Sequence, residues 1–488
     1  KEIHKREMRL VLDLVVNHTS DEHPWFEEAR KSRHNPYYNY YHWWPAEKGE
    51  PPLRLSYFDE EGNAWMYNKP TDSYYLHYFS RKQPDLNWEN PEIRQEIFDM
   101  MRFWFDKGID GFRMDSISLI AKDPSFPLID SKKYPDIFSF YAKEPRLHLY
   151  LHEMNRQVLS KYDCMSVGEG SAVMVDDVAK FVDPAREELN MLYHFDAARI
   201  RNTTLPDNPE SGIDYSLIAL KKMFTEWDKA IDKGWPSIYL GNHDQPRMVS
   251  RFGSDKDEFR ALSAKMLITF LLTMRGTPYW FAGDEIGMRN IRFDRIEDYN
   301  DIDTINRYKK AKAEGKDPQA VLDEQKETGR DNARTPFQWD RSPEAGFTAG
   351  TPWLKVNPDY TWINVADEEK DPTSILNYFK KVVSFRKENP SLIYGSYHLL
   401  DAENPQCYIF LRKTGADTYL IMLNFSPKAA ISTPGIDMSN AHVLLDNYGD
   451  RSHMAPQKDI TLRPFEAIVF QLNHPVYESF IDSLDLLE

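Results

Sequence analysis

Six short apolar runs constrain the fold of this chain more than any other feature. They span residues 8–16, 109–114, 163–167, 191–195, 237–240 and 277–281. Runs of this kind are typical of strands buried in a parallel sheet. Helical patterns lie between them, such as the one that begins at Asn90-Pro91 and ends at Gly108. Strands that alternate with helices predict an α/β fold.

The spacing of three carboxylates at the ends of these runs favours a barrel. Asp115, Glu169 and Asp244 are separated by 54 and 75 residues. At roughly 30 residues per βα unit, these gaps match one enlarged unit and then two. Six strands cannot close a barrel of eight. We therefore expect a (β/α)8 TIM barrel that lacks its first two strands in this sequence, with roughly 60 to 90 residues absent ahead of Lys1.

Changes in composition and in the pattern of apolar residues divide the rest of the chain into three segments outside the barrel. Residues 19–84 lose the alternation and are rich in Tyr, Trp, Pro and Asn, so we expect an irregular inserted domain with exposed aromatics. Residues 396–475 carry short alternating runs and predict an antiparallel β-domain. Residues 476–488 form a tail with the pattern of a short amphipathic helix. Residues 1–18 and 85–395 then make up the barrel.

Charge and cysteine content exclude several classes of function. Acidic residues outnumber basic ones by 77 to 61, giving a net charge of −16. Such a chain repels phosphate backbones, so we expect no nucleic-acid partner. Cys164 and Cys407 are too few for a disulfide framework, and their scarcity favours a cytoplasmic over a secreted or periplasmic location. No apolar run reaches about 18 residues, so we expect no membrane span.

The strand ends carry the residue types of an acidic pocket. Side chains two apart in a strand face the same side, so Arg113 and Asp115 point together. Barrel enzymes keep their active sites at the carboxyl ends of the strands. Corresponding positions on other strands hold His18, Glu169, His243 and Asp244.

Two carboxylates across a scissile bond are what glycoside hydrolysis requires. One must stay ionised to attack the anomeric carbon, and a neighbouring Arg113 lowers the pKa of such a group. The other must keep a proton near neutral pH, which burial or a like charge provides. The 12 Trp and 27 Tyr offer flat faces for sugar rings. These residues favour a carbohydrate-acting barrel enzyme.

Other interpretations stay open at this point. A strand-end Asp beside an Arg is often a structural ion pair, and His18 and His243 could merely satisfy backbone groups. A metal-dependent barrel hydrolase could use both histidines with the carboxylates. The sequence offers that hypothesis no His-x-His pair or other tight ligand cluster, and we expect no metal among the site residues.

Five ordered motifs resemble the α-amylase family of glycoside hydrolases. They are DLVVNH (13–18), QPDLN (83–87), GFRMD (111–115), VGEG (167–170) and NHDQPR (242–247). DNARTPFQWD (331–340) and GFTAGTPW (346–353) resemble its exo-acting α-glucosidase branch. That branch includes oligo-1,6-glucosidase, dextran glucosidase and trehalose-6-phosphate hydrolase. The resemblance spans nearly the whole chain.

The resemblance implies roles for individual residues. It implies Asp115 as nucleophile, Glu169 as general acid/base, and Asp244 as the group that stabilises the transition state. It implies substrate-binding roles for Asp13, His18, Gln83, Arg113, Ser116, His243 and Arg334. It also implies a retaining mechanism through a covalent glucosyl-enzyme, and a barrel with an inserted loop domain and a C-terminal β-domain.

Two positions depart from the pattern of members that prefer α-1,6 linkages. Those members usually have Val after the nucleophile and Met-Pro after the acid, where this chain has Ser116 and Gly170-Ser171. Members that act on α-1,4 linkages or sucrose have a smaller or hydroxylated residue after the nucleophile. The similarity of SYHLL and ITLRPFEAIVF near the C-terminus still favours the oligo-1,6-glucosidase group.

We therefore expect an exo-α-glucosidase that acts on short oligosaccharides, isomalto-oligosaccharides first. The alternatives are an α-1,4- or sucrose-cleaving α-glucosidase, a trehalose-6-phosphate hydrolase, and a catalytically inactive binding subunit of the same fold. Residues 220–231 (LKKMFTEWDKAI) lack the Arg/Asp-rich motif of sucrose isomerases, which disfavours an isomerase. The chemistry calls for no cofactor. The resemblance implies a structural calcium in the segment ahead of Lys1.

Overall fold

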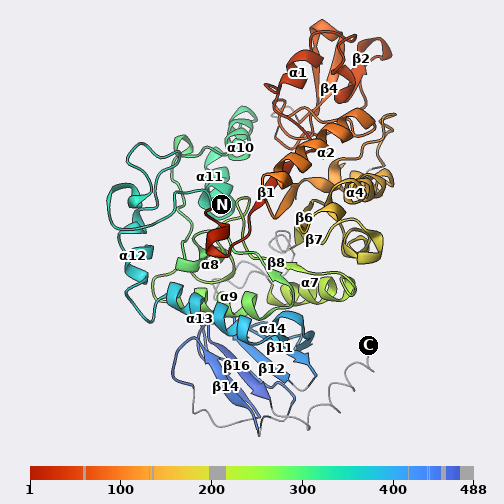
Figure 1. Cartoon of the computed structure of the whole chain (residues 1–488). Coiled ribbons are helices and arrows are strands. Elements are labelled where there is room, and N and C mark those ends of the chain that lie inside the picture. The colour runs from red at the N-terminus through yellow and green to blue at the C-terminus, as the bar shows by residue number, and fades with distance from the viewer. Residues whose placement is uncertain are drawn as a thin grey trace. The chain divides into compact units, whose positions relative to one another are not determined.

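The computed structural model forms two compact units, which we describe in turn (Figure 1). They are Lys1–Phe195 with Ala230–Pro236, and Asp196–Lys229 with Ser237–Glu488. The structure describes residues 1–58, 62–130, 132–133, 137–196, 216–415, 417–436, 438, 440–451 and 458–472. The predicted tail at 476–488 and the last residues of the predicted β-domain, 473–475, lie outside the described residues.

The first unit is built on a four-stranded parallel sheet. Its strands lie side by side in chain order: β1 (Val11–Val15), β5 (Gly111–Asp115), β6 (Met165–Gly170) and β7 (Met191–His194). The register pairs Val15 with Asp115 and Glu169 with Tyr193, which brings the strand ends to one edge. The first four predicted strands are confirmed. The helices of this part are α2 (Pro91–Asp106), α3 (Ile137–Tyr141), α4 (Arg146–Gln157) and α5 (Ala179–Val182).

A capping side chain sets the start of helix α2, and a glycine follows its end. The Asn90 side chain accepts a hydrogen bond from the Glu92 N–H, and Pro91 occupies the first helical position. Gly108, just beyond the helix, adopts φ +95°, a conformation that favours glycine. The helix buries one apolar stripe: Ile93, Ile97, Phe98, Met101 and Phe105.

The inserted segment is more regular than the sequence predicted. It contains α1 (Pro24–Ala29) and a three-stranded antiparallel sheet of order β2-β4-β3, formed by Trp43–Pro45, Ser73–Leu76 and Trp65–Asn68. The expected irregularity is therefore wrong. The expected exposure of aromatics holds only in part, because Tyr57 and Tyr67 are exposed whereas Tyr41, Trp65 and Tyr78 are buried. Aromatic side chains bury a large area each, so a small domain can use them as its core.

The second unit contains the last two predicted strands. They form a parallel pair, β8 (Ser237–Ile238) and β9 (Thr277–Pro278), and are shorter than the predicted runs. The helices of this unit are α7 (Leu217–Ala230), α8 (Met248–Phe252), α9 (Arg260–Thr273), α10 (Ile302–Ala313), α11 (Pro318–Thr328), α12 (Val365–Glu368), α13 (Ile375–Glu388) and α14 (Ser391–Tyr394).

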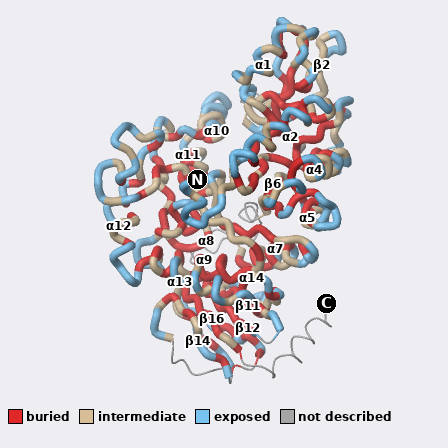
Figure 2. Tube along the Cα trace, in the orientation of Figure 1, coloured by how far each residue is buried: buried red, intermediate tan, exposed pale blue. Residues whose placement is uncertain are grey.

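The C-terminal part of the second unit is an antiparallel sheet of five strands. Their order is β10 (Ser396–Leu400), β11 (Cys407–Thr414), β12 (Asp417–Asn424), β16 (Ala467–Leu472) and β14 (His442–Asp446). A separate antiparallel pair joins β13 (Ala430–Ser432) to β15 (Ile460–Leu462). Helix α9 packs against β12 and β16, so the central strands are buried along nearly their whole length (Figure 2). The predicted antiparallel sheet is confirmed within the described residues.

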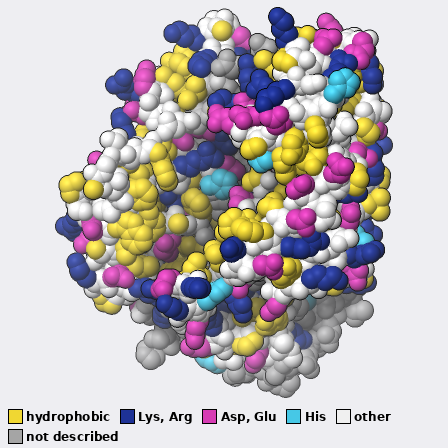
Figure 3. All heavy atoms as spheres, turned by 45° about the horizontal axis from the view of Figure 1, so that its top comes forward, with side chains coloured by type: hydrophobic (Ala, Val, Ile, Leu, Met, Phe, Trp, Pro, Cys, Tyr) yellow, Lys and Arg dark blue, Asp and Glu magenta, His cyan; other side chains and the backbone are white. Residues whose placement is uncertain are grey.

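The surface carries charges of both signs. Acidic and basic side chains are interspersed on the face that Figure 3 shows. Within the described ranges, no helix has the length and apolar character needed to cross a membrane.

The close approach of β5 and β6 gives a test of the parallel sheet. A Cβ on Gly111 would lie 2.2 Å from the carbonyl oxygen of Met165, so we expect Gly111→Ala to force the strands apart. The free energy of unfolding should fall by about 2 kcal/mol or more, measured by urea denaturation. Gly350→Ala is the matched control, because its nearest atom would lie 3.7 Å away. Equal midpoints for both variants would contradict the strand packing.

Candidate active site

Arg113 is the centre of a polar cluster at the carboxyl end of the parallel sheet. Its Nη1 donates to Asp13 Oδ1 at 2.8 Å and to Asp115 Oδ1 at 2.6 Å. Its Nη2 donates to Glu169 Oε2 at 2.8 Å. The three carboxylates come from three adjacent strands, β1, β5 and β6. The planar fork of a guanidinium suits this arrangement better than a single ammonium would.

Tyr193 belongs to the same cluster and was missed by the sequence analysis. Its hydroxyl accepts hydrogen bonds from Arg113 Nε at 2.9 Å and Nη2 at 2.5 Å. The residue lies on β7 directly opposite Glu169. A tyrosine within an apolar run has the same pattern as a core residue, so the sequence carried no signal that would single it out.

The surroundings of Glu169 favour its protonated form. Burial raises the pKa of Glu169 to about 8, and the neighbouring Asp115 carboxylate acts in the same direction. Arg113 and the Ser116 N–H oppose the shift without cancelling it. Glu169 can therefore hold a proton near neutral pH while Asp115 lies against a guanidinium.

Ser116 occupies a strained turn at the end of β5. Its φ of 44° and ψ of 33° lie in the left-handed region, which costs about 1–2 kcal/mol for a residue with a Cβ. The turn directs the Ser116 N–H at Glu169 Oε2, with a distance of 2.8 Å. The predicted site residue thus contacts the site through its backbone.

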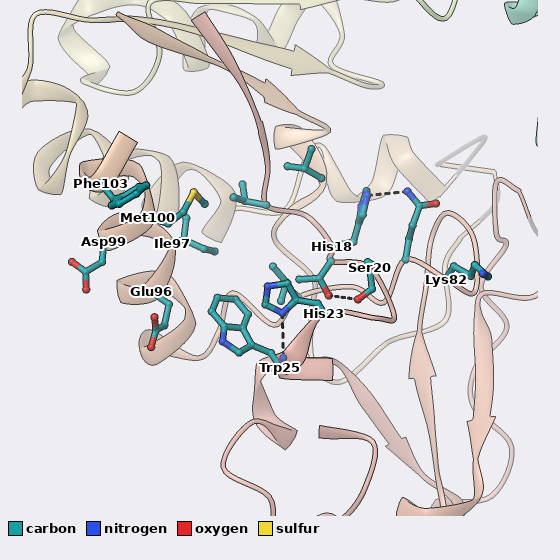
Figure 4. A pocket seen from close by; sticks show the side chains of 15 residues that line it. His18, Ser20, His23, Trp25, Lys82, Glu96, Ile97, Asp99, Met100 and Phe103 are labelled. Atoms are coloured by element: carbon teal, nitrogen blue, oxygen red, sulfur yellow. Dashed lines mark hydrogen bonds between the residues drawn. The ribbon is translucent and has the colours of Figure 1, made fainter. Parts of the chain in front are cut away.

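His18 and Gln83 form a second predicted pair in the first unit. His18 Nε2 lies 3.0 Å from Gln83 Nε2, as the dashed line beside His18 shows in Figure 4. Burial lowers the pKa of His18 to about 4, against the opposing effect of Asp115. The ring is therefore neutral at physiological pH.

A cavity of about 880 Å³ borders this pair. Helix α2 contributes Ile97, Met100 and Phe103 to its wall, and His18 lines another part of it (Figure 4). Gln83 is also a lining residue. The carboxylates bound by Arg113 are not among the described residues that line it. We therefore assign the chemistry to the Arg113 cluster rather than to this cavity.

The second unit holds a separate cluster around Asp244. Asp244 Oδ1 accepts hydrogen bonds from Arg334 Nη2 at 2.6 Å and Arg330 Nη1 at 3.2 Å, and Oδ2 lies 3.2 Å from His243 Nε2. Arg334 Nε also donates to the His243 carbonyl at 2.8 Å. Arg330, which also pairs with Asp301, was missed because it lies just ahead of the recognised motif.

The structure thus brings the predicted residues together in groups. The first unit joins Asp13, Arg113, Asp115, Ser116 and Glu169, and separately His18 and Gln83; the second unit joins His243, Asp244 and Arg334. That all of them meet in one pocket stays a prediction. In the described part of the chain, no group of three or more His, Cys, Asp or Glu side chains could hold a metal ion.

Comparison with known proteins identifies the relatives of this chain. Residues 1–395 match the family model described as "Alpha amylase, catalytic domain". Oligo-1,6-glucosidase from Parageobacillus thermoglucosidasius is 49% identical over 97% of this chain and 85% of its own length. Trehalose-6-phosphate hydrolase from Bacillus subtilis is 40% identical over 97% of this chain and 84% of its own length.

The chain is also similar in structure to solved enzymes. The isomaltulose synthase from Klebsiella sp. LX3 superposes with a TM-score of 0.90 at 38% identity. The comparison covers 97% of this chain and 84% of the other.

The raised pKa of Glu169 predicts a pH-dependent stability. The folded state binds the Glu169 proton more tightly than the unfolded state, so the free energy of unfolding falls as pH rises from about 4.5 to about 8. Glu169→Gln removes this effect. Its stability relative to wild type should therefore rise across that window, by up to about 1.4 kcal/mol per pH unit.

Urea denaturation at several pH values measures this difference. Glu50→Gln, at an exposed position, is the control and should follow wild type at each pH. A difference between Glu169→Gln and wild type that stays constant from about pH 5 to about pH 8 would contradict the assigned pKa shift.

Proposed function

The chain belongs to the α-amylase family of glycoside hydrolases, and on that premise we propose that it is an exo-α-glucosidase acting on short oligosaccharides. Its catalytic domain has the TIM-barrel fold and is followed by a C-terminal antiparallel sheet. The observation that carries the proposal is the unequal environment of two adjacent carboxyl groups. Arg113 holds Asp115, while burial raises the pKa of Glu169 to about 8.

In the proposed first step, Asp115 attacks the anomeric carbon of the terminal glucose. The glycosidic bond breaks, and Glu169 gives its proton to the departing oxygen. Because Arg113 and the Ser116 N–H both donate to Glu169 Oε2, the proton belongs on Oε1. The oxygen Oε1 would then be the one that faces the leaving group.

In the second step, water replaces Asp115 on the anomeric carbon. Glu169, now ionised, takes a proton from that water, and glucose leaves with retained configuration. Arg113 stabilises the negative charge that returns to Asp115. Both steps use side chains alone and call on no cofactor.

The cluster of the second unit supports binding of the same sugar. We assign Asp244 to stabilisation of the transition state, with Arg334 and Arg330 holding its carboxylate in place through charge-assisted hydrogen bonds. His243 would bind glucose hydroxyls beside it. Asp13, His18 and Gln83 are assigned to the glucose site from the first unit.

The predicted domain division is part of this proposal. The barrel would comprise 1–18 and 85–395, with β1, β5, β6, β7, β8 and β9 as its third to eighth strands, and 19–84 and 396–475 as the inserted and C-terminal domains. Two observations support it: four strands pair in chain order, and β8 pairs with β9 in parallel. We propose a cytoplasmic location, which the two free cysteines support.

The proposal also specifies which glycosidic linkage the enzyme prefers. The named oligo-1,6-glucosidases among the relatives support α-1,6 linkages. Ser116 favours α-1,4- or sucrose-cleaving activity instead, and one relative is a trehalose-6-phosphate hydrolase. We propose isomalto-oligosaccharides as the main substrates.

Asp115→Asn tests the mechanism. The variant lacks the nucleophile, so turnover of an aryl α-glucoside should fall by at least about 1,000-fold. Asp110→Asn is the matched control, because Asp110 pairs with His4 and Arg9 outside the cluster. Full activity in Asp115→Asn would overturn the mechanism. A wild-type protein that turns over no α-glucoside would instead favour the inactive binding subunit.

A substrate panel tests the linkage. With isomaltose, maltose, sucrose and trehalose 6-phosphate, we expect the highest kcat/KM for isomaltose and release of glucose first as its α-anomer. Rates by coupled glucose assay and anomers by proton NMR give both results. The linkage assignment fails if isomaltose is the poorest of the four.

A further inference from the structure

The first unit contains a buried lysine that the proposed mechanism does not use. Lys122 follows the short helix Ile117–Leu119 beyond β5, and its side chain is fully buried. Its Nζ donates to Asn17 Oδ1 at 2.6 Å and lies 3.1 Å from Asp85 Oδ2. Asp85 is also fully buried. A buried ion pair is by itself weak evidence for stability, because replacing both charges by apolar groups is often neutral or stabilising.

The Lys122 ammonium fixes the orientation of the Asn17 side chain. An ammonium has donors only, so it must face the amide oxygen of Asn17. The amide nitrogen then faces the other way, where Asn17 Nδ2 lies 3.2 Å from His18 Nδ1. Asn17 is itself fully buried, so its amide orientation is set by these protein contacts rather than by solvent.

This orientation decides where the proton of His18 can sit. The Asn17 amide nitrogen is a donor, so His18 Nδ1 must accept, and a neutral imidazole then carries its proton on Nε2. A doubly protonated ring would place an Nδ1–H against the Asn17 amide hydrogens. Burial and the nearby Lys122 charge both lower the pKa of His18, while Asp115 opposes them.

The Nε2–H faces Gln83, whose amide nitrogen points toward the ring and whose amide oxygen points away from it. Gln83 Oε1 accepts from the Ser80 N–H at 3.1 Å, which turns its amide nitrogen toward His18 Nε2. Two donors facing each other do not form a good hydrogen bond. The His18 Nε2–H therefore finds no acceptor in the Gln83 amide nitrogen and is available to a hydroxyl oxygen placed beside these groups.

We propose that Lys122 is a positioning residue that acts through Asn17 to hold His18 as the neutral Nε2–H tautomer, which donates to a sugar hydroxyl. This inference rests on the proposed function for the identity of the ligand. The relay itself, Lys122 to Asn17 to His18, rests on the contacts alone. Asp85 balances the charge of Lys122, and Asp115 is the other ionised group that acts on His18.

Asn17→Asp is the sharpest test, because it changes the chemistry of the relay and keeps its shape. A carboxylate accepts from both sides, so His18 should move its proton to Nδ1 or take up a second one. Long-range ¹H–¹⁵N NMR of histidine-labelled protein reports the tautomer, with His18→Gln to assign the signals. Wild type should show an unprotonated Nδ1, and Asn17→Asp a protonated one.

Two further variants separate the relay from the ion pair. Asp85→Asn removes the ion pair and leaves the Lys122–Asn17 bond, so the His18 tautomer should be unchanged. Lys122→Met with Asp85→Asn removes both buried charges and frees the Asn17 amide to turn, so the two tautomers should mix. Thermal unfolding of both variants identifies any loss of folding.

Activity gives an independent measure. The double variant should lose about 10-fold in kcat/KM for the aryl α-glucoside, relative to Asp85→Asn. A protonated Nδ1 in wild type, or one tautomer in all folded variants, would overturn the relay. Absence of α-glucoside turnover by wild type would overturn the proposed function instead, while the NMR result would still decide the relay.

Discussion

The contact of one guanidinium with three carboxylates is the interaction on which the candidate site in the first unit depends. Asp13, Asp115 and Glu169 would repel one another without Arg113 between them. Burial and the neighbouring Asp115 raise the pKa of Glu169 to about 8, although the same guanidinium opposes that shift. The proposed mechanism uses this difference in environment, because it assigns the acid and the nucleophile to two residues of nearly identical chemistry.

The sheet sets this geometry. Arg113 lies directly opposite Asp13 on β1, and β6 brings Glu169 to the other side. A slip of one residue between neighbouring strands would turn these side chains to the opposite face. The strained backbone at Ser116 adds a second fixed donor for Glu169. Strand register and the turn at Ser116 therefore fix the relative positions of the groups in this cluster.

Much of this could be predicted from the sequence, since parallel strands give apolar runs and their polar ends meet at one edge. Arg113, Asp115 and Glu169 were found in this way, whereas Asp13, in the middle of β1, was named only through the family resemblance. Tyr193 and Arg330 were not found, because their contacts with Arg113 and Asp244 arise only in the folded chain. The core of the insertion was misjudged for a related reason: composition records that aromatics are abundant and does not record which way they point.

The two ends of the inserted domain meet at its base. The Thr19 N–H donates to the Pro84 carbonyl at 3.1 Å, and the Asp21 N–H to that of Lys82 at 2.9 Å. His18 and Gln83, which contact each other, lie next to these paired residues in the chain. The segment is also anchored away from its ends, because Trp65 and Tyr78 share a buried apolar cluster with Phe126 and the Arg54 side chain donates to the Pro127 carbonyl. A replacement of residues 19–84 would therefore have to keep both the paired ends and this apolar contact, or the segment that follows β5 would lose part of its packing.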